Sequence, residues 1–502
     1  MTSQAAARAR EMALRVSIGA GRARLVQLVL VEAAILALLA AATGGAFAGW
    51  SAPLVASRIT FHNRPVQLHL PADWRVLGFA LALMLAVTLL FGLAPALRAS
   101  AVKPSSALKG GDRPHFRGRL MQALVAAQAA FCFLVLFASC LFVTTFERLS
   151  RQPTGFAPER LLALDVTLRH PEAPEIWNQV AEHLRTVPGV SSVGLGGSAP
   201  LSDSLRGFHR VSINGAPPSR DPVFFMAVAP GWFGAMKLPV VAGRDFISSD
   251  TNPKFAIVNQ AFAKQYYPAE NPVGKLFGDG GSSIQIVGVT VNAPYDDIHV
   301  PVPPMAYTPF RYVDAKGSES PTRGATFMVR TANADPLALA LTLRNEVARA
   351  WPGFRVSEVH TEEELIQAET VRERLLAALA LFFGMLALLL ASLGLYGVLD
   401  YSVLRRRREI GIRMAIGARA THIVWRVAAD ALAMVLAGAA AGLAAGLISA
   451  RFIEALLYQV KPNDPRMVAV PWLVLLGAAV LATIPAAMRA IQTDPMESLR
   501  AE

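Results

Sequence analysis

The sequence has few of the features that equip a soluble enzyme. Only 17% of its 502 residues are charged, and it contains two cysteines. Cys132 and Cys140 fall inside one apolar stretch, so neither can hold an exposed domain together as a disulfide. The sequence contains no GxxxxGK[ST] phosphate loop, no GxSxG nucleophile elbow and no HExxH zinc motif. We therefore expect no catalytic residue, no resident metal and no directly bound cofactor.

Apolar residues are abundant instead. They make up 53% of the chain, and the mean hydropathy is +0.40, values typical of a membrane protein. The net charge of +12 could suggest a nucleic-acid partner. The basic residues, however, lie in short runs beside long apolar stretches, which is typical of cytoplasmic membrane flanks. The lipid bilayer is therefore an expected partner and nucleic acid is not.

Six apolar stretches are long enough to cross a bilayer, which takes about 20 residues. An even number places both termini on one side. Basic residues concentrate before the first stretch, at 98–119 and at 405–419, so these flanks and both termini are predicted to be cytoplasmic. The predicted spans are 25–49, 76–97, 120–146, 375–400, 423–448 and 468–488.

One short sequence motif, basic and about half apolar, occurs twice, and we call it the phrase. RAREMALRVSIGA at 8–20 matches RRREIGIRMAIGA at 406–418, at an offset of 398 residues. The same offset relates Glu32 to Asp430 and Gly44 to Gly442. A second pair, RASAVKPSSAL at 98–108 and RAIQTDPMESL at 489–499, closes each copy. The chain therefore contains an internal duplication, and we expect it to begin inside the first repeat.

The phrase has features of a short amphipathic helix. Glu11 precedes Arg15 by four residues, as Glu409 precedes Arg413, which is the favoured order for an ion pair on a helix. A glycine then ends each copy. The apolar residues of the second copy also alternate as in a strand, so the local pattern leaves both structures open. Either the phrase only anchors the topology, or its repeated charges form a docking surface.

Residues 148–372 have a mixed α/β pattern. A strand at 161–169, a helix at 175–187 and a strand at 191–197 suggest a βαβ unit. A further helix is predicted at 336–351 behind an Asp335 cap, and GLGGS at 194–198 predicts a turn after a strand rather than an oxyanion loop. We expect two compact lobes, because the segment exceeds a typical domain. The other predicted strands are 209–215, 224–230, 255–259, 283–291 and 325–331.

Several of these motifs, taken in order, resemble one known family. RRREIGIRMAIGA follows an apolar helix ending in GLYGVLDYSV, and DPMESL closes the chain. The segment between contains GWFGAMKLPVVAGRDF and FAIVNQAFAKQYYPAENPVGK. Together they resemble the MacB/FtsX-type permeases of ATP-binding-cassette systems, and in particular the duplicated orphan permeases of that superfamily. The resemblance covers nearly the whole chain.

The resemblance implies an α-helical integral membrane protein with a large α/β extracytoplasmic domain of two lobes. Residues 1–119 are expected to be a partial first permease unit, in which the coupling helix 8–20 and two spans lead to a cytoplasmic linker at 98–119. Residues 120–147 open the second unit, 148–372 form the MacB-like domain, and 373–502 form the FtsX-like permease domain with its coupling helix at 405–418.

In the family each phrase docks on a cytoplasmic ATPase, so ATP is expected to act through a partner chain. The resemblance implies a non-enzymatic permease subunit of a bacterial inner membrane, with both termini cytoplasmic and 148–372 outside. Periplasmic or outer-membrane proteins are further expected partners. The residues expected to couple to the ATPase are Arg10, Glu11, Arg15, Gly19, Arg408, Glu409, Arg413 and Gly417.

Two acids lie inside predicted spans. Glu32 and Asp430 fall within about two turns of the cytoplasmic end of their spans. An acid inside the membrane suggests a functional role, and we favour a structural or coupling role over proton relay. Two alternatives to the permease stay open: an ion-coupled secondary transporter that uses these acids, and a membrane-anchored extracytoplasmic binding or sensor module.

Overall fold

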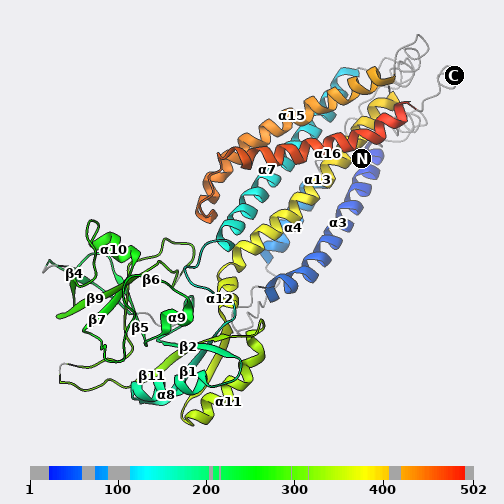
Figure 1. The fold of residues 1–502 in the computed structure, drawn as a ribbon. Coiled ribbons are helices and arrows are strands. Elements are labelled where there is room, and N and C mark those ends of the chain that lie inside the picture. The colour runs from blue at the N-terminus through cyan, green and yellow to red at the C-terminus, as the bar shows by residue number, and fades with distance from the viewer. Residues whose placement is uncertain are drawn as a thin grey trace. The chain divides into compact units, whose positions relative to one another are not determined.

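The structure is a computed structural model, and it forms two compact units. It describes residues 22–58, 74–88, 114–202, 207–213, 216–295, 297–314, 316–405 and 420–491. Met1–Phe146 and Arg372–Glu502 form one unit, and Glu147–Val371 form the other. We name them the helical unit and the sheet unit, after the long helices and the strands that Figure 1 shows in them.

Long helices rich in leucine, alanine and valine make up the described part of the helical unit. The last of them begins at a proline, a residue well suited to the first helical position. Asp464 precedes it and accepts a hydrogen bond from the backbone N–H of Arg466 at 3.0 Å. The helices are α3 (Arg22–Arg58), α4 (Trp74–Thr88), α7 (Pro114–Ser150), α13 (Val371–Arg405), α15 (Ala420–Ile453) and α16 (Pro465–Ile491).

Among the described residues, five helices are long and apolar enough to cross a membrane. Each overlaps one of the predicted spans. The remaining predicted span, 76–97, is described only up to residue 88, as α4. The apolar stretches of the five helices are Leu30–Ser51, Gln122–Ser150, Val371–Asp400, Ala431–Leu456 and Pro465–Pro485.

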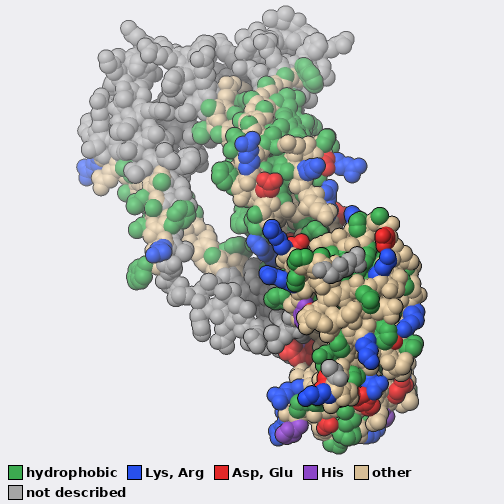
Figure 2. Space-filling model, turned by 90° about the vertical axis from the view of Figure 1, so that its left-hand side faces the viewer, with side chains coloured by type: hydrophobic (Ala, Val, Ile, Leu, Met, Phe, Trp, Pro, Cys, Tyr) green, Lys and Arg blue, Asp and Glu red, His purple; other side chains and the backbone are tan. Residues whose placement is uncertain are grey.

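Large apolar side chains cover the outside of these helices. On α13, Met385 is 64% exposed and Leu389 is 58% exposed. Figure 2 shows hydrophobic side chains on the described helical surface, whereas charged side chains are scattered over the sheet unit. Exposure of this kind is costly in water and favourable in lipid, so it agrees with a membrane location.

One mixed sheet runs through the sheet unit. Its strand order is β12-β1-β11-β2-β5-β10-β7-β9-β8-β4, with β3 paired to β5 and β6 paired to β9. β10 is parallel to β5 and β7 is parallel to β9. The strands are β1 (Leu161–Glu172), β2 (Val190–Gly196), β3 (Gly207–His209), β4 (Val211–Ile213), β5 (Val223–Val228), β6 (Val240–Gly243), β7 (Phe255–Asn259), β8 (Leu276–Asp279), β9 (Ser282–Thr290), β10 (Met305–Pro309), β11 (Thr322–Thr331) and β12 (Arg355–Thr361).

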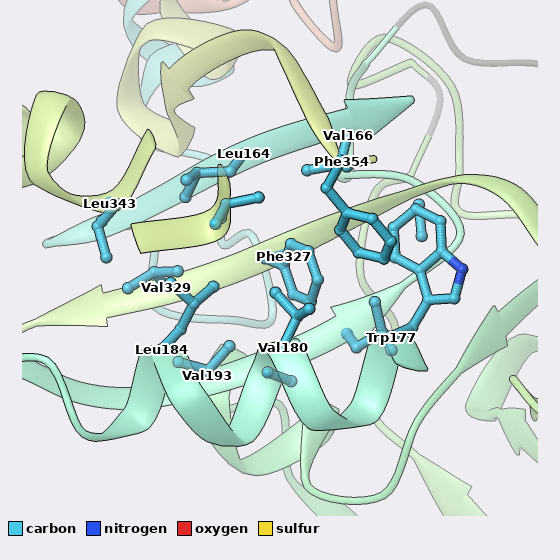
Figure 3. Close-up of a cluster of buried hydrophobic side chains, with 14 of the residues drawn as sticks. Leu164, Val166, Trp177, Val180, Leu184, Val193, Phe327, Val329, Leu343 and Phe354 are labelled. Carbon is cyan, nitrogen blue, oxygen red and sulfur yellow. The ribbon is translucent and has the colours of Figure 1, made fainter. Parts of the chain in front are cut away.

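The two ends of the sheet have separate cores. At the β12 end, α8 (Pro174–Arg185) and α11 (Ala340–Ala350) cover one face of the sheet. Trp177 of α8 is fully buried there, with its ring 4.4 Å from that of Phe354 (Figure 3). At the other end α10 (Gln260–Tyr266) places the buried Phe262 against β7, β8 and β9. Short helices α9 (Trp232–Met236) and α12 (Glu362–Glu369) complete the unit.

Most of the predicted strands are present, with differences that have physical causes. The predicted βαβ unit is confirmed in part: β1, α8 and β2 follow in order, but β11 lies between the two strands and is antiparallel to both. The predicted strand 209–215 is wrong as one element, because β3 pairs with β5 while β4 pairs with β8. The predicted helix 336–351 begins as a short 3-10 turn, Pro336–Leu339, capped by Asp335 as predicted.

Candidate functional site

Both copies of the repeated phrase lie outside the described residues, but the helices beside them are described. α13 ends at Arg405, before the second copy, and α15 begins at Ala420, after it. α3 begins at Arg22, which is 398 residues before Ala420. The helices therefore repeat at the same interval as the phrases. The predicted coupling residues Arg10, Glu11, Arg15, Gly19, Arg408, Glu409, Arg413 and Gly417 all lie outside the described residues.

In the second copy α7 packs against α15 through glycines four residues apart. A Cβ added at Gly438 would lie 2.4 Å from the carbonyl oxygen of Ala126, and one at Gly442 would lie 2.4 Å from that of Ala130. Only glycine permits helix axes this close. At the matching position of the first copy, a Cβ on Gly44 meets no described atom within 4 Å.

A tryptophan pair repeats this difference between the copies. Trp472 of α16 packs edge-on against Phe133 of α7, with ring centroids 5.5 Å apart. Trp74, which lies 398 residues earlier in α4, is 84% exposed. The two copies therefore have helices at matching positions. Among the described residues, α7 packs against these positions in the second copy and not in the first.

α7 contacts α13 through polar side chains. The amide of Gln128 donates a hydrogen bond to the carbonyl oxygen of Leu390 at 2.7 Å. Further along, the hydroxyl of Ser139 donates to the carbonyl oxygen of Ala380 at 2.6 Å, beside Gly384. Hydrogen bonds between helices and small residues at the contact are typical of packing inside a membrane. α7 is thus the common partner of α13 and α15.

The chain connects α7 and α13 to two neighbouring strands. α7 ends at Ser150 and a short segment leads to β1. On the other side β12 continues into α12 and then into α13 at Val371. β1 and β12 are paired antiparallel, from Leu162↔Thr361 to Thr167↔Arg355. The chain therefore joins both helices to the same strand pair.

Two local structures fix these connections to the sheet unit. The buried guanidinium of Arg330 donates to the carbonyl oxygens of Ala235, Glu159 and Ala157, at 2.8, 2.7 and 2.7 Å. Two of these acceptors belong to the segment between α7 and β1. Burial lowers the pKa of Arg330, yet an arginine stays charged in proteins. At the other connection Thr361 and Glu364 form a capping box at the start of α12.

The two intramembrane acids lie at matching positions. Arg22 to Glu32 and Ala420 to Asp430 are the same interval, so both acids lie almost three turns into their helices. The apolar stretches of these helices begin at Leu30 and Ala431, so both acids lie near the start of their spans. Glu32 is half-buried. The side chain of Asp430 is outside the described residues.

The GLGGS stretch of the sequence has a structural explanation. In the GLGGS stretch (194–198), β2 continues to Gly196 and a bend follows at Gly197 and Ser198, so the predicted turn after a strand is confirmed in part. A Cβ on Gly196 would lie 2.9 Å from the indole nitrogen of Trp232, so this glycine makes room for α9. The hydroxyl of Ser198 is buried against that of Tyr295. No described nucleophile therefore stands in an oxyanion-loop geometry at this stretch.

The fold and these connections define a class: a membrane protein with several spans whose helices lead into a large external α/β sheet domain. Two protein families match parts of the chain. The FtsX-like permease C-terminal family matches residues 1–104 and again 381–495. The MacB-like periplasmic core domain family matches residues 131–343. The chain belongs to the MacB/FtsX-type permeases of ATP-binding-cassette transporters.

Individual relatives agree with this assignment. The chain is 23% identical over 294 residues to the uncharacterized ABC transporter permease YknZ of Bacillus subtilis, covering 54% of this chain and 68% of that protein. It is 27% identical over 308 residues to the macrolide export ATP-binding/permease protein MacB of Rhodospirillum rubrum, covering 59% of this chain and 44% of that protein. The match with MacB of Marinobacter nauticus is 24% identical and covers 42% of that protein. The chain thus spans less than half the length of these MacB proteins.

Among solved structures, the periplasmic region of MacB from Actinobacillus actinomycetemcomitans matches 44% of this chain and 96% of that structure. The identity is 11% and the TM-score is 0.31.

Proposed function

We propose that the chain is the membrane permease subunit of an ATP-driven efflux or mechanotransmission system. A separate cytoplasmic ATPase binds both repeated phrases and, through ATP hydrolysis, moves the helices that flank them. The permease itself performs no chemistry, and ATP acts through the partner chain. The charged residues of the two phrases, Glu11, Arg15, Glu409 and Arg413, would form the docking surface, and Gly19 and Gly417 would end it.

One structural observation supports this mechanism most strongly: α7 and α13 lead to the adjacent strands β1 and β12. The hydrogen bonds of Arg330 and the capping box at Thr361 make both connections short and stiff. Motion between α7 and α13 is then passed to the sheet unit rather than absorbed in a loose linker. The few ionisable residues in the spans agree with transmission of motion better than with passage of a polar substrate.

The proposal also covers the membrane topology and the side of the membrane on which the cargo is met. Six spans cross the bacterial inner membrane, both termini are cytoplasmic, and 148–372 form two lobes outside. The relatives' names, macrolide export and pyoverdine export, support an export role. The sheet unit would then meet its cargo, and periplasmic or outer-membrane partners, outside the cytoplasm.

Co-purification with the ATPase tests the docking surface. Full-length chain in detergent is compared with the double variant Arg15→Glu, Arg413→Glu, which reverses one charge in each phrase. The control is the double variant Arg451→Glu, Arg466→Glu. Both arginines are exposed, one near the C-terminal end of α15 and the other near the N-terminal end of α16. We expect the double variant to lose the ATPase and the control to retain it.

Equal recovery of the ATPase by the wild type and the double variant would show that the phrases do not dock it. If transport then survived ATP depletion but stopped when the proton gradient collapsed, the ion-coupled transporter with Glu32 and Asp430 would take its place.

A further inference from the structure

Three side chains with metal-binding donors meet on the sheet face opposite the core of Figure 3. Asp165 lies on β1, and Glu358 and His360 lie on β12. Their carboxylate and imidazole donor atoms all fall within 4.8 Å of one another. The imidazole of His360 is 3.0 Å from a carboxylate oxygen of Glu358. The proposed function does not use this cluster.

The strand register creates the cluster. Asp165 is directly opposite Glu358, and Ala163 is opposite His360, so the small alanine leaves room above it for the imidazole. β12 has a bulge at Ser357, whose hydroxyl donates to the backbone carbonyl of Asp165 at 3.0 Å. On the other side the hydroxyl of Thr326 donates to the Asp165 carboxylate. Both neighbours fix the orientation of Asp165.

A fully buried carboxylate lies next to the cluster. Glu362 has 0% exposure, and neither of its carboxylate oxygens has a hydrogen-bond partner. Thr361 before it is extended, with φ −86° and ψ 148°, so the side chain of Glu362 projects on the same side as that of His360. A buried carboxylate without a donor is costly, and a cation would satisfy it.

We propose that Asp165, Glu358 and His360 form a binding site for a divalent cation of the zinc type, with Glu362 as its buried carboxylate. One imidazole with carboxylates is a donor set that suits Zn²⁺, and Mn²⁺ less well. The site is open to solvent at Glu358, whose side chain is 52% exposed, while the side chain of His360 is 15% exposed. A cation can therefore enter from outside and reach the buried side.

A bound cation would link β1 to β12. These are the two strands that the chain joins to α7 and α13. The cation would stiffen the strand pair against sliding, because ligands from both strands would have to separate. This role is independent of whether a cytoplasmic ATPase drives the helices.

Zinc binding to the full-length chain in detergent tests the site. Isothermal titration and metal analysis after gel filtration give the stoichiometry for the wild type, Glu358→Gln, His360→Asn and Glu362→Gln. The matched control is His299→Asn, in a second cluster of the same donor types, Asp297, His299 and Glu369. Glu358→Gln is the variant least able to disturb folding, because it changes a half-exposed side chain.

We expect the wild type to hold one Zn²⁺ more than Glu358→Gln and His360→Asn, and Glu362→Gln to bind at least about tenfold more weakly. Zn²⁺ should raise the apparent Tm of the wild type and of His299→Asn but not that of His360→Asn. In EDTA, Glu362→Gln should be at least as stable as the wild type, because it removes a buried carboxylate without a donor. Equal zinc stoichiometry in wild type, Glu358→Gln and His360→Asn would overturn the proposal, as would a loss confined to His299→Asn.

Discussion

Single side chains decide how firmly the segment between α7 and β1 is held in the sheet unit. Arg330 is the clearest example, because one buried guanidinium holds three carbonyl groups from α9 and from the segment between α7 and β1. No sequence motif predicted this role for an arginine inside the predicted strand 325–331. Only the fold brings its carbonyl partners together.

Replacing this guanidinium should weaken the sheet unit markedly. Arg330→Met removes three charged hydrogen bonds and leaves buried carbonyl groups without donors, so we expect a loss of about 3 kcal/mol. For a unit of this size that corresponds to a fall in apparent Tm of roughly 6–12 °C. Thermal unfolding of the full-length chain measures it. Arg323→Met, an exposed arginine on the same strand, is the control and should shift Tm little.

The Arg244–Asp250 pair should make stability depend on pH in the acid range. Burial alone would raise the pKa of Asp250, but hydrogen bonds from the Arg244 guanidinium, at 2.6 and 3.1 Å, and from the N–H of Ile247 lower it on balance. The folded state then binds fewer protons than the unfolded state, so this stability is present above the unfolded pKa, about 3.9, and is lost as pH falls below it.

Asp250→Asn isolates that effect. The variant should be less stable than the wild type at pH 7, by on the order of 1–2 kcal/mol, and the difference should shrink as pH falls below about 4. Thermal unfolding at a series of pH values measures it. A difference that stays constant down to pH 3 would show that the ion pair contributes no pH dependence.

At the scale of elements, the sequence predicts helices better than it predicts their contacts. Apolar stretches of span length are a local property, and α7, α13, α15 and α16 follow from them. Which face of α15 meets α7 depends on Gly438, Gly442 and Gly446, which the sequence shows only as small residues. Likewise β12 was not predicted, because six of its seven residues are exposed or only partly buried and do not alternate cleanly.

The close contact of α7 with α15 gives a matched pair of substitutions. Gly442→Leu should clash with the backbone of α7 at Ala130 and cost about 2–3 kcal/mol. Gly44→Leu, at the same position of the first copy, should cost little, because no described atom lies within 4 Å of its Cβ. Apparent Tm in detergent compares the two. Equal losses would mean that the face of α3 at Gly44 is packed as tightly as that of α15.

At the scale of the whole molecule, the proposed mechanism requires α7 and α13 to move relative to each other. Ser139 and Gly384 face each other across this contact. A Cβ on Gly384 lies 3.7 Å from that of Ser139, within the range of about 3.5–4.5 Å that a disulfide needs. The pair Ser139→Cys, Gly384→Cys, with Cys132 and Cys140 changed to alanine, can therefore lock the helices reversibly.

When the disulfide between positions 139 and 384 is formed, we expect the partner ATPase to bind normally but ATP-driven export to stop. A reductant should restore export. Proteoliposomes containing both chains measure export, and mass spectrometry confirms the disulfide. The single variant Ser139→Cys controls for the substitution itself. Full export by the oxidised protein would show that α7 and α13 act as one rigid body and that another pair of helices carries the motion.

The sequence by itself determined the membrane character, the duplication and the family. Each depends on residues close together in the chain: a bilayer requires about 20 apolar residues in a row, and a repeated phrase can be read directly. Only the tertiary structure decided that α7 and α13 lead into paired strands, that Arg330 holds one connection, and that Asp165 stands opposite Glu358 beside the buried Glu362. These facts depend on strand register and helix contacts, which join residues nearly two hundred positions apart. Such contacts cannot be predicted from local composition.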